Sequence, residues 1–145
     1  MQSQQELIKP ETINEKTSLH TIVKKILQSL TSSAAEHSSL VMNDIPCTFM
    51  VDTDQQKLSS LLSIILSKII LQGKESCYRL SARQYSNTVL LSIKNTGSQA
   101  EYENKYYSED THELCQTLGG CISINEFHNH STSVTFSFRS GMNVA

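Results

Sequence analysis

Hydrophobic residues recur at helical spacing early in the chain. From Leu19 to Ala34 they stand three or four positions apart, which places them on one face of an amphipathic helix. This face consists of Leu19, Ile22, Val23, Ile26, Leu27, Leu30 and Ala34. His20 and Lys24 fall outside the face, so we expect both side chains to be solvated.

A second helical stretch follows, and the sequence marks both of its ends. Thr53 and Gln56 have the spacing of a capping box, and Gly73 is a typical residue after the last turn. Asp52 and Asp54 suit the positive end of a helix. The predicted core face is Leu58, Leu61, Leu62, Ile65 and Ile69.

Alternation of apolar and polar residues predicts strands elsewhere. Two short extended segments, 40–43 and 45–51, precede the long helix, and two hairpins with turns at 86–87 and about 128–131 follow it. The apolar positions of the hairpins are Tyr78, Leu80, Ala82, Val89, Leu91, Ile93, Ile122, Ile124, Val134, Phe136 and Phe138. Because each strand has a single apolar face, helices should cover only one side of the sheet. The pattern predicts a two-layer α/β (α+β) sandwich with a mixed, mostly antiparallel sheet.

The length and composition are those of one soluble globular domain. The chain has 145 residues, 38% hydrophobic and 18% charged, with a formal net charge of −2. This charge balance argues against nucleic acid as a partner. No stretch has the pattern of a signal peptide or the length of a membrane span, so we expect a cytoplasmic protein. The predicted organisation is a poorly ordered lead or linker (1–17), one domain (18–140) and a tail (141–145).

Neither cysteine nor histidine spacing indicates a metal site. The four cysteines are Cys47, Cys77, Cys115 and Cys121, and no two form a CxxC pair. We place three in strands and one in a short helix, as small apolar residues in a reducing compartment. His128 and His130 lie at a polar turn with no third ligand nearby in sequence, so we predict no metal there.

Three motifs occur in a fixed order along the chain. Residues 54–62 read Asp-x-x-x-Leu-x-x-Leu-Leu, and residues 89–97 read Val-Leu-Leu-Ser-Ile-Lys-Asn-Thr-Gly. A short helix near 111–118 then leads to Gly-Gly-Cys-Ile and, at 134–138, to Val-Thr-Phe-Ser-Phe. Over about 18–139 this order resembles the ATP-binding domain shared by sensor histidine kinases, gyrase, the Hsp90 chaperones and the MutL proteins. The resemblance implies the histidine-kinase ATPase-like fold.

The resemblance also implies where a nucleotide would bind, and this sequence departs there from the family. Two family asparagines on the long helix, one of them a magnesium ligand, correspond to Ile64 and Lys68, and isoleucine has no oxygen to offer. The family aspartate that accepts a hydrogen bond from adenine corresponds to Asn95, an uncharged and weaker acceptor. Asn95 is followed by Gly97, but Gln99 replaces the next glycine of that motif.

The phosphate-binding loop is the third departure. No glycine occurs between Gly97 and Gly119, whereas the family places glycines at the start of the later helix. The acidic residues of this region would repel a triphosphate: Glu101, Glu103, Glu109 and Asp110. We therefore predict no productive phosphoryl transfer, no catalytic residue and no cofactor, because this chemistry depends on positioning and charge stabilisation.

The same helix has a stripe beside its core face. Leu61, Ile64, Lys68 and Leu71 form it, and in the family this stripe borders the nucleotide. Two interpretations stay open: side chains fill the former pocket and extend the core, or the stripe is an apolar surface for a protein partner. The loop tyrosines at 102, 106 and 107 pack over the pocket in the first case and contact the partner in the second.

The resulting hypothesis is a catalytically degenerate histidine-kinase-like domain that acts through protein contacts in bacterial signalling. A response regulator is one candidate partner. Two alternatives require ATP and magnesium: a divergent but genuine ATP-binding domain of a two-component sensor kinase, and an anti-sigma-like switch.

Overall fold

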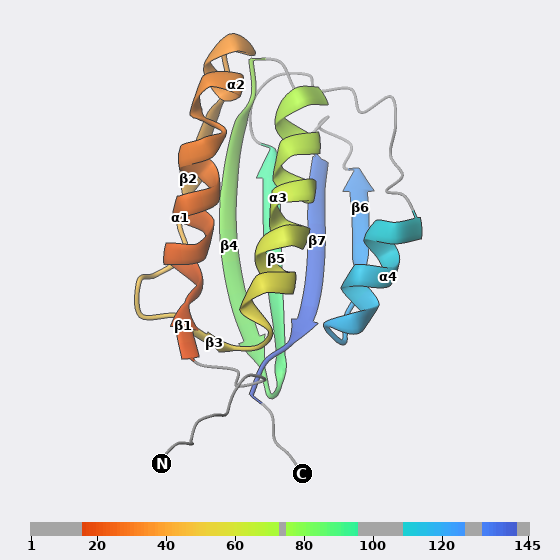
Figure 1. Cartoon of the computed structure of the whole chain (residues 1–145). Helices are drawn as coiled ribbons and strands as arrows, with labels where there is room; N and C mark the ends of the chain where they lie inside the picture. The colour runs from red at the N-terminus through yellow and green to blue at the C-terminus, as the bar shows by residue number, and fades with distance from the viewer. Residues whose placement is uncertain (1–15, 73–74, 96–108, 127–131, 142–145) are drawn as a thin grey trace, which may run out of the picture.

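A computed structural model describes residues 16–72, 75–95, 109–126 and 132–141 (Figure 1). The strands are β1 (Lys16–Ser18), β2 (Leu40–Asn43), β3 (Met50–Asp52), β4 (Cys77–Tyr85), β5 (Thr88–Asn95), β6 (Ile122–Glu126) and β7 (Thr132–Arg139). The helices are α1 (Leu19–Ser29), α2 (Thr31–Glu36), α3 (Gln55–Gln72) and α4 (Glu109–Thr117).

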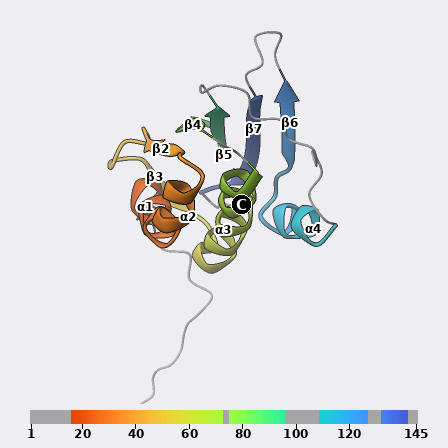
Figure 2. The same ribbon diagram turned by 90° about the horizontal axis from the view of Figure 1, so that it is seen from above.

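The main sheet has five strands in the order β2-β4-β5-β7-β6. β2 runs parallel to β4, and the other neighbours are antiparallel. All four described helices lie on one face of this sheet, and its other face carries no helix that the structure describes (Figure 2). The predicted two-layer α/β sandwich with a mixed, mostly antiparallel sheet is therefore confirmed.

The core lies between α1, α3 and the sheet. The five residues predicted as the core face of α3 are all buried, as are Leu80, Val89 and Phe136 on the facing strands. The hydroxyl of Tyr78 donates a hydrogen bond to the carbonyl oxygen of Ile69 at 3.1 Å, which ties β4 to α3 inside the core. Strand periodicity thus gave the buried side of the sheet correctly.

The first helix is shorter than its apolar pattern predicts. The helix ends at Ser29, and α2 begins at Thr31 after a break at Leu30. The Ser29 and Thr31 hydroxyls donate to the carbonyl oxygens of Ile26 and Leu27, at 2.6 Å and 3.1 Å. Such side-chain bonds compete with the backbone ladder and favour a break.

The segment between β2 and α3 also differs from the prediction. In the predicted 45–51 stretch only Met50 and Val51 belong to a strand, β3, which pairs with β1 in a separate two-stranded sheet. The prediction that the His20 side chain is solvated is wrong, because its Nδ1 lies 2.6 Å from the carbonyl oxygen of Ile45. Lys24 is exposed as expected.

The domain extends slightly beyond its predicted limits. Strand β1 begins at Lys16, inside the segment predicted as a lead. At the other end, the amide of Gly141 donates to the carbonyl oxygen of Asp52 at 3.0 Å. The rest of the predicted lead and tail, residues 1–15 and 142–145, lie outside the described residues.

The N-terminal cap of α3 is not the predicted one. The Lys57 amide donates to Oδ1 of Asp54 at 3.1 Å, so Asp54 takes the capping position that the sequence pattern assigned to Thr53. Thr53 is instead buried. The predicted stop, Gly73, lies outside the described residues, which follow the helix to Gln72.

The two residues that follow the end of α4, Gly119 and Gly120, are glycines for two different reasons. Gly119 has φ +80°, and the amides of Gly119 and Gly120 donate to the carbonyl oxygens of Gln116 and Cys115 at 2.9 Å and 3.1 Å. This is a Schellman motif, in which glycine suits the left-handed position. At Gly120 a Cβ atom would lie 1.7 Å from the carbonyl oxygen of Ser137, so β7 leaves no room for a side chain.

The cysteines are less buried than predicted. All four are free, but Cys47 lies in a turn and Cys121 precedes β6, and both are exposed. Cys115 alone is fully buried. Burial, with a smaller contribution from Cys121, raises the pKa of Cys115 to about 11, so this thiol is neutral at physiological pH.

Candidate functional site

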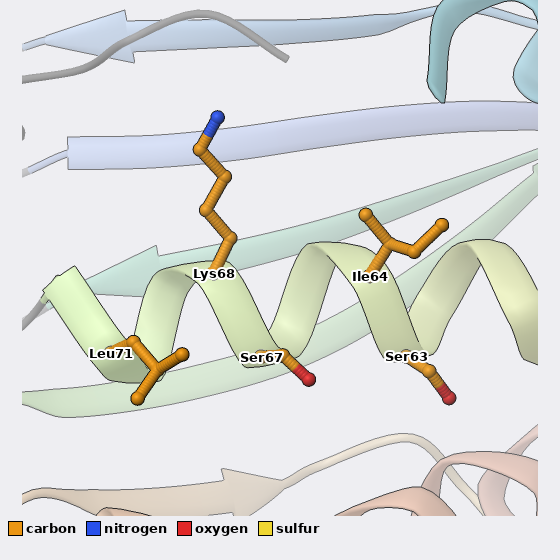
Figure 3. Close-up of a pocket in the computed structure, with 5 residues that line it drawn as sticks. All are labelled: Ser63, Ile64, Ser67, Lys68 and Leu71. Carbon is orange, nitrogen blue, oxygen red and sulfur yellow. The ribbon is translucent and has the colours of Figure 1, made fainter. Parts of the chain in front are cut away.

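The outer surface of α3 contains a shallow depression of about 560 Å³. We call its lining residues the α3 face: Ser63, Ile64, Ser67, Lys68 and Leu71. Ile64 and Lys68 project from one side of the helix, and Ser63 and Ser67 from the other (Figure 3). The depression therefore includes three of the four stripe residues singled out in the sequence, together with two serines that the sequence pattern missed. Helical spacing alone would have found Ser67, which stands one turn from Ile64.

Leu61 does not belong to this surface. Its exposed fraction is 0%, whereas those of Ile64 and Leu71 are 42% and 59%. Three helical positions correspond to roughly 300° of rotation, so Ile64 stands about 60° around the helix from Leu61 and clears the sheet. The prediction that Leu61 contributes to a partner surface is wrong. The interpretation that Ile64 and Leu71 extend the core is also wrong.

The chemistry of the α3 face does not suit magnesium. Its polar groups are two serine hydroxyls and the Lys68 ammonium, without a carboxylate or an amide. Magnesium requires several oxygen ligands in near-octahedral geometry, and an ammonium repels a cation. Across the described parts of the chain, no three His, Cys, Asp or Glu side chains gather as a metal site would require.

Asn95 is not among the residues that line the depression on α3. It ends β5 with an exposed fraction of 3%, and its Nδ2 donates to Oγ of Ser76 at 3.4 Å. The protein itself therefore engages the amide at the position where the family contacts adenine. Gly97, the second residue predicted there, lies outside the described residues.

The N-terminus of α4 carries negative charge. Glu109 and Asp110 occupy its first turn, and both are exposed. Carboxylates are stable at this end because they face the positive pole of the helix dipole. A polyphosphate that approached this pole would be repelled by the negative charges of Glu109 and Asp110. The other loop residues considered in the sequence analysis lie outside the described residues. They include the tyrosines at 102, 106 and 107 and the histidines at 128 and 130.

None of the described helices is both long and apolar enough to cross a lipid bilayer.

Comparison with known proteins identifies the fold. No protein-family model and no curated protein matches the sequence. Solved structures do match: the Acinetobacter baumannii histidine kinase AdeS has a TM-score of 0.74 at 16% identity, over 88% of this chain and 68% of that one. The mycobacterial sensor histidine kinase MprB has a TM-score of 0.68 at 10% identity, over 88% and 98%.

A third match is histidine kinase ThkA in complex with response regulator protein TrrA, with a TM-score of 0.68 at 11% identity, over 88% of this chain and 42% of that one. These similarities establish the histidine-kinase-type ATPase fold for this chain, as its sequence motifs predicted. At such low identity they establish the fold and not the activity.

Proposed function

We propose that this domain of histidine-kinase-type ATPase fold is a docking module in two-component signalling and does not transfer phosphate. The observation that carries the proposal is the α3 face. The position where the family places a magnesium ligand holds Ile64, and that side chain is exposed rather than packed into the core.

The composition of the α3 face supports a protein contact. Ile64 and Leu71 expose large aliphatic side chains, while Lys68, Ser63 and Ser67 supply polar groups around them. Exposed apolar groups bordered by polar residues are typical of protein–protein contact sites. Exposing two such side chains costs solvation free energy, which a bound partner would recover.

A response regulator is the partner that we propose. The support is fold-level analogy: ThkA, which shares the fold, has been solved in complex with response regulator TrrA. An α3 face that no longer serves a nucleotide is free to serve such a contact.

ATP with magnesium should not stabilise the protein. The described α3 face offers no magnesium ligand beyond two neutral hydroxyls, and the carboxylates of Glu109 and Asp110 oppose a triphosphate. A thermal-unfolding titration to millimolar ATP and magnesium should leave the melting temperature unchanged. Ligand at one hundred times its Kd would instead stabilise the fold by about 2.7 kcal/mol, which is roughly 5–10 °C for a domain of this size. A rise of that order would overturn the proposal in favour of the divergent kinase or the anti-sigma-like switch.

A photo-crosslinking amino acid at Ile64 should capture a protein with a response-regulator receiver domain when the chain is expressed in its own cells. The same group at Lys24, which is exposed on α1, is the matched control and should capture none. With the captured regulator purified, Ile64→Asp should weaken binding about 30-fold, because a charge placed centrally in an apolar contact is poorly tolerated. Equal capture at both positions, or unchanged affinity, would contradict the proposed docking role.

A further inference from the structure

The uncovered side of the main sheet carries a second depression, of about 390 Å³. Its lining comes from three neighbouring strands, β4, β5 and β7. We call the six residues used below the basic sheet face: Ser81, Arg83, Leu90, Ser92, Lys94 and Ser133. The register places Ser81 beside Ser92, Arg83 beside Leu90, and Lys94 beside Ser133. All described helices lie on the opposite side of the sheet (Figure 2).

Charge on these strands has one sign. The sequences of β4, β5 and β7, which line the depression, contain two arginines in β4, one lysine in β5 and one arginine in β7, and no aspartate or glutamate. The β7 arginine, Arg139, lines a different depression beside Asp52 and Asp54, so the positive charge of this face comes from β4 and β5. The whole chain has a net charge of −2, so this excess of positive charge is local and opposes the overall balance. Such an excess attracts anionic groups to one face.

The positive groups are incompletely compensated. Arg79 and Lys94 stand directly opposite each other on adjacent strands, an arrangement that is destabilising for like charges. Asp44 offsets Arg79, with 2.9 Å between Nε and Oδ2. Within the described parts of the chain, neither Lys94 nor Arg83 has an ion-pair partner. A carboxylate brought by another molecule would therefore meet two available cations.

The distance between Arg83 and Lys94 determines which ligand can contact both of them. Arg83 stands opposite Leu90, and Lys94 is four residues further along β5. At about 3.4 Å per residue and about 4.8 Å between strands, their Cα atoms are roughly 14 Å apart. Four residues of an extended segment cover a similar distance. Serine hydroxyls between the two cations can donate hydrogen bonds to such a segment.

We propose that the basic sheet face binds an extended acidic protein segment with carboxylates four residues apart. This second docking surface is independent of the α3 face. A single-stranded nucleic acid is disfavoured as the occupant, because such sites stack bases on aromatic side chains. Tyr85 is the only aromatic residue among the described residues that line the depression.

The test uses the whole chain and the heptapeptide Ser-Glu-Ser-Ser-Ser-Glu-Ser, with a matched peptide in which glutamine replaces both glutamates. Amide chemical shifts are followed by NMR at low and at 0.5 M salt. We expect the acidic peptide to shift the amides of Ser81, Ser92 and Ser133, to bind about tenfold more tightly than the glutamine peptide, and to lose affinity at high salt.

The double variant Arg83→Gln/Lys94→Gln should weaken the acidic peptide about tenfold. The matched control is Lys24→Gln/Lys25→Gln, which removes the same charge from exposed positions of α1 and should change affinity by less than about twofold. Equal binding of both peptides, equal loss in both variants, or tighter binding of a seven-residue oligothymidylate would each overturn the proposal. None of these outcomes bears on the α3 face.

Discussion

Replacing Gly120 with alanine should lower the free energy of unfolding by about 3 kcal/mol. The new Cβ would lie 1.7 Å from the carbonyl oxygen of Ser137 and 2.3 Å from its carbonyl carbon. Both are backbone atoms of β7, and no side-chain rotation relieves the contact. Either the turn after α4 or β7 must move, and the hydrogen bond from the Arg139 amide to the carbonyl oxygen of Leu118, at 2.8 Å, weakens.

The neighbouring glycine provides the control. Gly119→Ala also introduces a methyl group, but it lies 3.0 Å from the Cβ atom of Arg139, an exposed residue. Its main cost is the left-handed backbone at φ +80°, about 1–2 kcal/mol for a residue with a side chain. Chemical denaturation of both variants checks the difference. Equal losses, or a loss below about 1 kcal/mol for Gly120→Ala, would mean that β7 does not pack against this turn as described.

Leu61→Ala should lower the free energy of unfolding by about 3 kcal/mol, because it removes a fully buried side chain and leaves a cavity. Ile64→Ala, three residues away on the same helix, should cost less than about 1 kcal/mol, because Ile64 is 42% exposed. Chemical denaturation again gives both values.

This pair tests how α3 is oriented over the sheet. Similar costs for the two variants would mean that the helix is rotated from the described position and that Ile64 is part of the core. The expected difference also makes the docking experiment interpretable. A variant at Ile64 that stays folded can lose a partner only through the α3 face.

The two proposed surfaces lie on opposite sides of the molecule. The α3 face belongs to the helical layer, and the basic sheet face belongs to the uncovered side of the sheet. Because the sheet separates them, a partner on one leaves the other accessible.

Some predictions from sequence depended only on local pattern, and these were confirmed. The core face of α3 and the two hairpins follow from helical and strand periodicity, since burial on one side of an element leaves its period in the sequence. The turn at Gly119 and Gly120 was also placed correctly, for a different reason: the positive φ of Gly119 and the close approach of β7 to Gly120 both select glycine.

Other features depend on competition between neighbours that no local pattern records. The break at Leu30 arises where the Ser29 and Thr31 hydroxyls take helix carbonyls. Asp54 caps α3 in place of Thr53, which is buried. Both alternatives have suitable residue types, so the sequence cannot choose between them.

The sequence by itself determined the fold class and the buried faces of α3 and of the main strands. Only the tertiary structure showed that Leu61 is buried whereas Ile64 is exposed, because the boundary between core and surface depends on how α3 is rotated over the sheet. Only the strand register brought Arg83 and Lys94, eleven residues apart in the chain, onto one uncovered face. Periodicity reports which side of an element is buried, whereas the neighbours of its exposed side are set by how the elements pair and pack.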